Sequence, residues 1–206
     1  MKRNNTSRIR AILFGVMVVG ALSVAPAGWC ATISDNFNDG NDTAPTIDWQ
    51  HYDPIGQYLT ELYGPTTNAQ WNFPGGNTYQ IVAFPPPAGW GDVFKRARAG
   101  SFTTNSFTNF YASVDVLDWS HTNRQVFGIL ARVGTPSFDS TSGYLFDWDS
   151  SDPNSTTAGD MHIARLVDEA PIDLDGSTVF GDNGIHLVAG HSYRFVFMGV
   201  SNVFRG

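Results

Sequence analysis

The stretch Phe110-Tyr111-Ala112-Ser113-Val114-Asp115-Val116 decides the fold, because apolar and polar residues alternate along it. Successive side chains of a strand point to opposite faces, so the even-numbered residues share one face and the odd-numbered residues share the other. Such a period of two is typical of a strand that packs one face on a core. Residues 125–133 repeat the period, and their core face would carry Phe127, Ile129, Ala131 and Val133.

Other short runs of β-branched and aromatic residues, bounded by Gly, Pro, Asn and Asp, predict further strands. Tyr193–Val200 is nearly continuous in apolar residues, as expected for a strand covered on both faces. Weaker candidates lie at 33–37, 49–52, 79–84, 97–103, 144–148, 161–167 and 185–188. No segment beyond residue 27 has a convincing helical period, and no linker or repeat divides the chain. We therefore predict an all-β fold, a two-sheet antiparallel jelly-roll β-sandwich.

The first 27 residues have the pattern of a secretory signal peptide. Four basic residues precede an apolar run at 11–24, which is too short to span a bilayer. Ala25-Pro26-Ala27 supplies small residues for cleavage after Ala27, and cleavage after Ala31 or a lipid anchor on Cys30 are the alternatives. We expect a helical signal peptide at 1–27, a domain at 28–206, a secreted or cell-surface location, and no membrane span in the mature chain.

The charge of the mature chain limits its partners. Without the signal, 8 Lys and Arg stand against 19 Asp and Glu, a formal charge of −11. Such an acidic surface argues against binding to nucleic acids and anionic membranes. The one cysteine, Cys30, lies beside the cleavage site, so no internal disulfide is expected.

Several short motifs resemble secreted bacterial proteins of the concanavalin A-like lectin/glucanase superfamily, of the laminin-G-like kind. They are DNFNDGND at 35–42, WQHYDP at 49–54, RAGS at 98–101, FGILAR at 127–132, SGY at 142–144 and SYRF at 192–195. The resemblance implies a two-sheet jelly roll with one structural calcium ion and a concave sheet that faces carbohydrate. It also implies further strands and a sorting segment after Gly206. Either the last strand completes the sheet or the domain is incomplete at its C-terminus, and we expect the second.

No catalytic residue is predicted. Glycoside hydrolysis needs two carboxylates flanking the bond, and glucanases of this superfamily carry them in Glu-x-Asp-x-x-Glu or Glu-x-Asp-x-Glu strings, which this sequence lacks. Asp147-Trp148-Asp149 has carboxylates two residues apart but reads as a strand end that runs into a turn. No Gly-x-Ser-x-Gly elbow occurs, and the five histidines are scattered without a zinc-binding spacing.

Calcium is the expected cofactor, because Asp and Asn oxygens in turns suit a hard cation. Asp35, Asp39 and Asp42 fall within eight residues around Gly40. The alternatives are a second cluster at Asp147, Asp149 and Asp152, or a plain turn at 38–42. The superfamily resemblance favours the first cluster.

Aromatic rings that stack on sugars, with polar groups that fix their orientation, would bind carbohydrate. Trp119 and Trp148 are predicted to be exposed, since each follows a strand into a polar stretch. Asp115, Arg132 and Arg165 lie opposite apolar neighbours and would line a concave sheet. Our leading hypothesis is a secreted, non-catalytic module that binds polysaccharide or a cell-surface glycan. A structural cell-surface protein with no small ligand and a glycoside-active enzyme are the rivals.

Overall fold

The computed structural model describes residues 32–43, 47–63, 68–83, 97–120, 125–150, 159–174 and 185–206. The chain divides into two units, residues 1–35 and 36–206. In the first unit, residues 32–35 are described and form neither helix nor strand, and the predicted signal peptide lies outside the described residues. In the second unit the described elements are antiparallel strands and one short helix, which confirms the all-β prediction.

The stretch Phe110–Val116 is strand β5, as its alternation predicts. It pairs with β10 (Tyr193–Val200), which also pairs with β11 (Val203–Arg205), so the sheet has the order β11-β10-β5. The register sets Ala112 opposite Phe197 and Asp115 opposite Arg194. The even-numbered residues of β5 therefore share a face with the buried phenylalanines of β10.

Four further strands form a second sheet in chain order. They are β6 (Val126–Ala131), β7 (Gly143–Asp149), β8 (Asp160–Val167) and β9 (Ala170–Asp173). Gly128 of β6 pairs with Asp147 of β7. A Cβ at Gly128 would lie 2.0 Å from the Phe146 carbonyl oxygen, so this close strand approach requires glycine.

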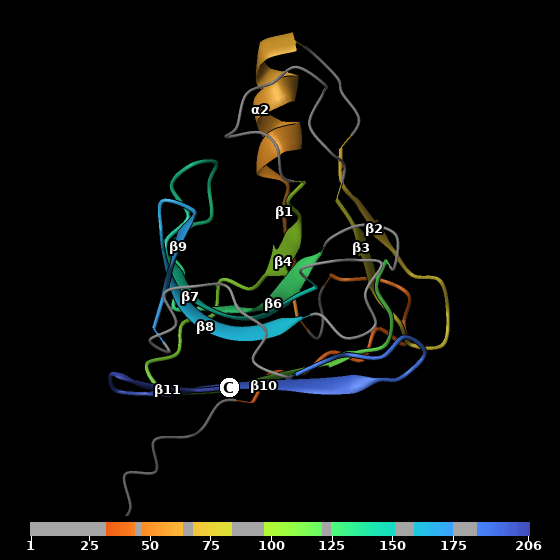
Figure 1. Cartoon of the computed structure of the whole chain (residues 1–206). Helices are drawn as coiled ribbons and strands as arrows, with labels where there is room; N and C mark the ends of the chain where they lie inside the picture. Colours follow the sequence, from red (N-terminus) through yellow and green to blue (C-terminus); the bar gives the residue numbers. More distant parts are fainter. Residues whose placement is uncertain are drawn as a thin grey trace, which may run out of the picture. The chain divides into compact units, whose positions relative to one another are not determined.

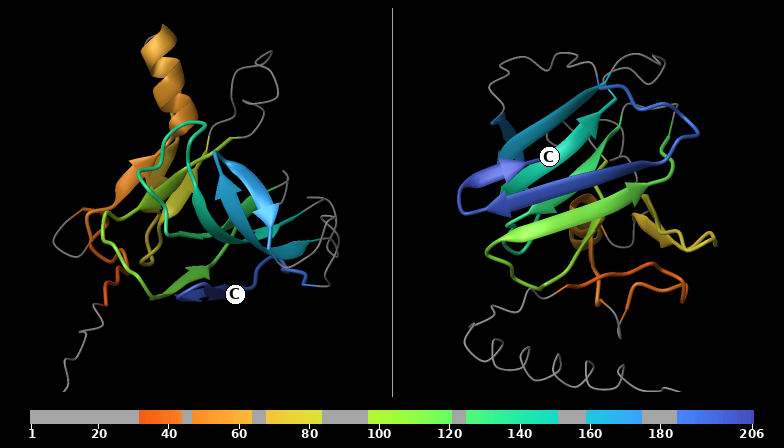
Figure 2. Two further views of the ribbon diagram at one scale, coloured as in Figure 1. Left: turned by 90° about the vertical axis from the view of Figure 1, so that its left-hand side faces the viewer. Right: turned by 90° about the horizontal axis from the view of Figure 1, so that it is seen from below.

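The two sheets pack against each other through aromatic side chains. Phe146 and Trp148 of β7 form a buried cluster with Phe195 and Phe197 of β10. The Phe146 ring lies 5.7 Å from that of Phe195 and 5.8 Å from that of Phe197, centroid to centroid. Figure 1 shows β10 below β7 and β8, and the right-hand view of Figure 2 shows β5 and β10 in front of the four-stranded sheet. Burial of these large apolar rings is the main stabilising contribution of the fold.

Two small sheets flank this pair. One joins β1 (Gln50–Tyr52) to β4 (Gly100–Phe102), and the other joins β2 (Gln70–Asn72) to β3 (Gln80–Val82). The predicted strands at 33–37 and 185–188 are wrong, because the structure has no strand there. Strands β2, β9 and β11 were not predicted, whereas the equally short β1, β3 and β4 lie within the predicted ranges 49–52, 79–84 and 97–103.

The helix α2 (Pro54–Tyr63) contradicts the expectation that no helix follows the signal. Asp53 caps the N-terminus of this helix, because its Oδ1 accepts a hydrogen bond from the Gly56 amide at 2.9 Å. Pro54 fits the first helical position. Ile55 and Leu59 are buried on one side of the helix. The Asp-Pro pair was the available signal for this helix.

Candidate functional site

The tryptophans predicted to bind sugar belong to the core. Trp148 is 3% exposed, so the prediction that its ring faces solvent is wrong. Strand β7 continues through Trp148 to Asp149, and Trp148 shares the core face with Phe146. Its indole Nε1 donates to the Ile185 carbonyl oxygen at 3.2 Å. Trp119 is half-buried against the Trp148 ring, with 5.6 Å between centroids.

The three predicted polar residues do not line one sheet. Asp115 lies on β5, whereas the exposed Arg165 lies on β8 of the other sheet. Arg132 follows β6, and its guanidinium carbon lies 5.0 Å from the Phe204 ring centroid. Its Nη2 donates to the Thr108 carbonyl oxygen at 2.8 Å. Of the three, Asp115 alone lies in the surface hollow described next.

The outer face of β5 and β10 presents polar groups beside an exposed ring. Arg194 Nε donates to Asp115 Oδ1 at 2.6 Å, and Arg194 Nη2 donates to Asp115 Oδ2 at 2.7 Å. The two side chains are 65% and 51% exposed. They line a hollow together with Leu117, Ser192 and Tyr193. Tyr111 and Ser113 extend the same face along β5, and both are exposed.

The ion pair keeps both partners charged. Its hydrogen bonds and charge lower the pKa of Asp115 below its ordinary value of 3.8 and raise the pKa of Arg194. Both groups face water, so the pair adds little to stability. Its two parallel hydrogen bonds instead hold the carboxylate and the guanidinium in one plane.

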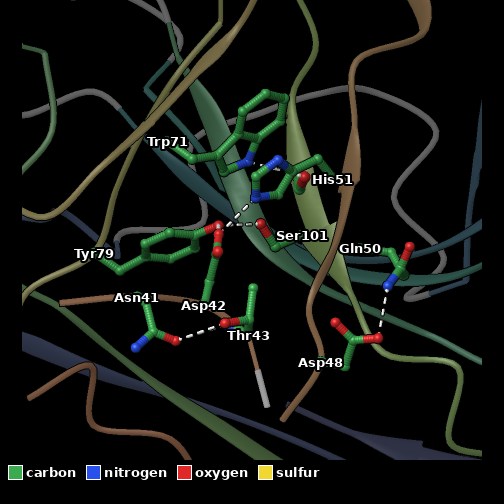
Figure 3. A network of polar contacts seen from close by, with 10 residues as sticks. Asn41, Asp42, Thr43, Asp48, Gln50, His51, Trp71, Tyr79 and Ser101 are labelled. Carbon is green, nitrogen blue, oxygen red and sulfur yellow. Dashed lines mark hydrogen bonds and ion pairs between the residues drawn. The ribbon is translucent and has the colours of Figure 1, made fainter. Parts of the chain in front are cut away.

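A second polar cluster centres on Asp42 (Figure 3). Asp42 Oδ2 accepts from His51 Nε2 at 2.5 Å and from the Tyr79 hydroxyl at 2.7 Å. Because the Tyr79 proton goes to Asp42, Ser101 donates its own proton to the Tyr79 oxygen at 2.7 Å. The His51 ring also lies parallel to Trp71, with 3.9 Å between centroids. The cluster therefore joins the segment before β1 to both two-stranded sheets.

The order of groups in this cluster excludes a nucleophilic triad. In such a triad the histidine stands between the carboxylate and the serine, so that it can take the serine proton. Here Asp42 stands between His51 and Tyr79, and Ser101 contacts the tyrosine. Burial raises the pKa of Asp42, but the hydrogen bonds from His51 and Tyr79 outweigh it and leave that pKa below 3.8. We conclude that Asp42 has a structural role: its carboxylate binds His51 and Tyr79 and so holds their segments together.

The predicted calcium ligands Asp35, Asp39 and Asp42 lie around the turn at 38–40. Asp42 Oδ2 accepts hydrogen bonds from His51 and Tyr79. Asp39 Oδ1 accepts the Asn41 amide at 3.2 Å. In the described part of the chain, no three His, Cys, Asp or Glu side chains are grouped to hold a metal ion. The alternative ligand Asp152 lies outside the described residues.

A third polar cluster joins β1 to the turn between β8 and β9. The Tyr52 hydroxyl donates to Glu169 Oε1, and Arg98 Nη1 lies 2.9 Å from Glu169 Oε2. Burial and the Glu169 carboxylate raise the pKa of Tyr52, so the phenol stays protonated. Glu169 has a φ of 62°, which fits its place in a tight hairpin turn. This cluster is mostly buried and connects elements of the fold.

The face of the four-stranded sheet away from the core carries buried ionisable groups. Asp147 pairs with His162, and Asp149 pairs with Asp160, across β7 and β8. All four residues are less than 7% exposed. His162 Nδ1 lies 3.6 Å from Asp147 Oδ1. Sequence reasoning noted Asp147 and Asp149 but missed Asp160 and His162, whose spacing of two along a strand was the available signal.

Comparison with protein-family models, curated proteins and solved structures finds no match to this chain. No helix within the described ranges is long and apolar enough to cross a membrane. The function is therefore inferred from the chemistry of the faces and clusters above.

Proposed function

We propose that this chain is a secreted, non-catalytic jelly-roll module that binds carbohydrate on the outer face of β5 and β10. One observation carries the proposal: Tyr111, which is 66% exposed, shares a face with the exposed Asp115–Arg194 pair. Among the residues whose side-chain exposure the structure describes, Tyr111 is the sole Phe, Tyr or Trp in the exposed class. An exposed ring beside fixed polar groups is the combination that stacks on a sugar and orients its hydroxyls.

Two further observations support the setting of this site. The N-terminal sequence has the pattern of a secretory signal, which favours an extracellular ligand. Two antiparallel sheets that share an aromatic core are compatible with jelly-roll connectivity. The motifs that resemble the lectin/glucanase superfamily point the same way.

The test is a pull-down of the purified protein with insoluble polysaccharides, followed by affinity electrophoresis with soluble ones. Tyr111→Ala should weaken binding about tenfold or more, because the stacked ring contributes roughly 1.5–3 kcal/mol. Val203→Ala is the matched control, since Val203 is 60% exposed on β11 of the same sheet. If no polysaccharide is retained, the result favours a structural cell-surface protein with no small ligand. If Tyr111→Ala binds normally, the site lies elsewhere.

A second candidate function is glycoside cleavage on the opposite sheet. Asp147, Asp149 and Asp160 are buried on one face. Asp149 and Asp160 are directly paired, and directly paired side chains in an antiparallel sheet lie roughly 5 Å apart at Cβ. Retaining glycosidases hold their carboxyl groups at a similar separation. Release of reducing sugar that disappears in Asp149→Asn, while polysaccharide binding persists, would support this function. A wild-type protein that binds polysaccharide but releases no sugar would exclude it for that substrate.

Calcium binding by Asp35, Asp39 and Asp42 stays a prediction, and a thermal melt tests it. A metal that binds the folded state alone raises the melting temperature with its concentration. If the prediction holds, the melting temperature should rise with calcium, and Asp39→Asn should abolish that rise. A melting temperature that calcium and a chelator both leave unchanged would refute it.

A further inference from the structure

We infer that the ligand of the β5–β10 face is a neutral, extended glycan chain that lies along β5. This inference rests on the proposed function and narrows it to a ligand class. It excludes an anionic polysaccharide and a single sugar as the main ligand. Length, charge and hydrogen-bonding chemistry on this face each support it.

The length of the face comes from the alternation of β5. Tyr111, Ser113 and Asp115 follow one another on the outer face, and alternate residues of a strand are about 7 Å apart. The Cα atoms of Tyr111 and Asp115 are therefore about 13 Å apart along the strand. The hollow at Leu117 and Ser192 continues beyond Asp115. One sugar ring cannot contact both ends of this row. A chain of several sugars can stack on Tyr111 and reach the ion pair.

The charge of the face argues for a neutral ligand. Asp115 and Arg194 cancel each other, and the whole chain has a formal charge of −7, which repels polyanions. One more cation belongs to this face, since Arg205 of β11 is exposed and pairs with Met198, which in turn pairs with Tyr111. Arg205 is thus two strands away from the row on β5. A substitution of Arg205 therefore tests whether the ligand is neutral or anionic.

The hydrogen-bonding groups suit sugar hydroxyls. A hydroxyl both donates and accepts, and the ion pair offers both partners side by side. Asp115 has spare lone pairs, while Arg194 uses Nε and Nη2 in the pair and keeps further N–H donors. The two parallel hydrogen bonds fix both side chains before the ligand arrives, so little further ordering is needed on binding. Ser113 adds an exposed hydroxyl between this pair and the ring.

The first experiment compares ligands on the full chain by isothermal titration calorimetry. The probes are β-glucan, xylan and galactomannan as neutral polymers, alginate and polygalacturonate as anionic ones, and oligosaccharides of any neutral polymer that binds. Affinity should rise with oligosaccharide length above the monosaccharide. It should change less than about twofold between about 0.05 M and about 0.5 M salt. Arg205→Gln should leave it unchanged.

Three other results would overturn all or part of this inference. Salt-sensitive binding of alginate or polygalacturonate that Arg205→Gln abolishes would overturn the neutral ligand and leave the proposed function standing. Equal affinity for the monosaccharide and the longer chain would overturn the extended site in the same way. If none of the five polymers binds, the inference and the proposed function both fail.

A charge swap tests the ion pair itself. Asp115→Arg and Arg194→Asp each place two like charges side by side and should each weaken binding about tenfold or more. The double variant restores the pair in the opposite order and should recover most of the affinity. Exposed ion pairs contribute at most about 1 kcal/mol to stability, so all three variants should fold. Normal binding by both single variants, with unchanged circular dichroism spectra, would remove the pair from the site.

Discussion

Asp42 shows how one buried carboxylate joins segments that are distant in the sequence. Its Oδ2 receives hydrogen bonds from β1, through His51, and from the residue before β3, through Tyr79. The Phe37 ring stacks on Tyr79 with 4.5 Å between centroids, so the segment around Asp42 is bound at two points. Hydrogen bonds to a charged group contribute about 1.5–3 kcal/mol each, more than neutral ones.

Asp42→Asn should therefore destabilise the fold by about 1–3 kcal/mol near neutral pH, measured by urea unfolding. The folded-state pKa of Asp42 is lowered, so its contribution is complete above the ordinary value of 3.8 and is lost as the pH falls through the folded value. The stability gap between wild type and variant should consequently shrink in acid. Asp48→Asn is the control, because Asp48 is exposed and accepts only a 3.1 Å bond from Gln50 among the contacts described. A gap that stays constant down to acid would refute this role.

The sequence could predict which residues share a face, but not which side of a sheet is covered. Tyr111 and Asp115 were correctly assigned to one face of β5. Trp148 was assigned to solvent because polar residues follow it, yet its face is set by the pairing of β7 with distant strands. Arg194 was missed as a site residue because its importance comes from Asp115, which is distant in sequence and opposite it in register.

At the scale of elements, the helix α2 depends on its first residue. Asp53 uses Oδ1 to cap Gly56 and Oδ2 to accept the amide of the buried Ala69 at 2.6 Å. Asp53→Ala removes a helix cap, which costs about 1 kcal/mol, and leaves a buried amide unbonded, which costs about 1–3 kcal/mol. We expect a total loss of about 2–4 kcal/mol in urea unfolding.

Gly56→Ala gives an independent check of the same cap. Alanine favours helices over glycine by about 1 kcal/mol, so propensity alone predicts stabilisation. A Cβ at Gly56 would lie 2.2 Å from Asp53 Oδ2, so we expect a net loss instead. Asp53→Asn separates the two roles of this side chain, because asparagine caps helices well but offers one acceptor oxygen, so it should keep the cap and lose the bond to the Ala69 amide. A stabilised Gly56→Ala protein would mean that the Asp53 carboxylate is not held against the helix.

Strand prediction was most direct where the period was long enough to read, and the short β1, β3 and β4 were predicted from composition and flanking turn residues. Strands β5, β6 and β10 have six to eight residues, and each was predicted from alternation or from a continuous apolar run. Strands of three or four residues, such as β2 and β11, hold too few residues to show a period. The position of such a strand is determined by the strand with which it pairs. A short stretch of sequence around it need not contain that partner.

At the scale of the whole molecule, the two large sheets should unfold cooperatively, because they share one aromatic cluster. Phe127 of β6 lies 5.7 Å from Phe195 of β10, and Phe110 of β5 lies 5.2 Å from Phe197, ring to ring. Local patterns predicted that such a core exists. They could not predict that β10 pairs with β5, since many residues separate the two strands and pairing is chosen by the collapsed chain.

Phe197→Ala tests this shared core. Phe197 is 0% exposed, and its ring contacts those of Phe110, Phe146 and Phe204 from three other strands. Removing a buried phenylalanine ring costs about 3–5 kcal/mol, which is a large part of the roughly 5–15 kcal/mol that stabilises a domain. Tryptophan fluorescence and far-UV circular dichroism should lose their signals at one shared, lowered urea midpoint.

The matched control is Val200→Ala, because Val200 lies on the same strand but is 60% exposed. Its midpoint should stay near that of wild type, since exposed substitutions change stability by less than about 0.5 kcal/mol. Separate midpoints for the two signals in Phe197→Ala would contradict a shared core. The four-stranded sheet would then keep its structure without the ring that β10 inserts beside Phe146, and the two layers would have to be treated as independently stable.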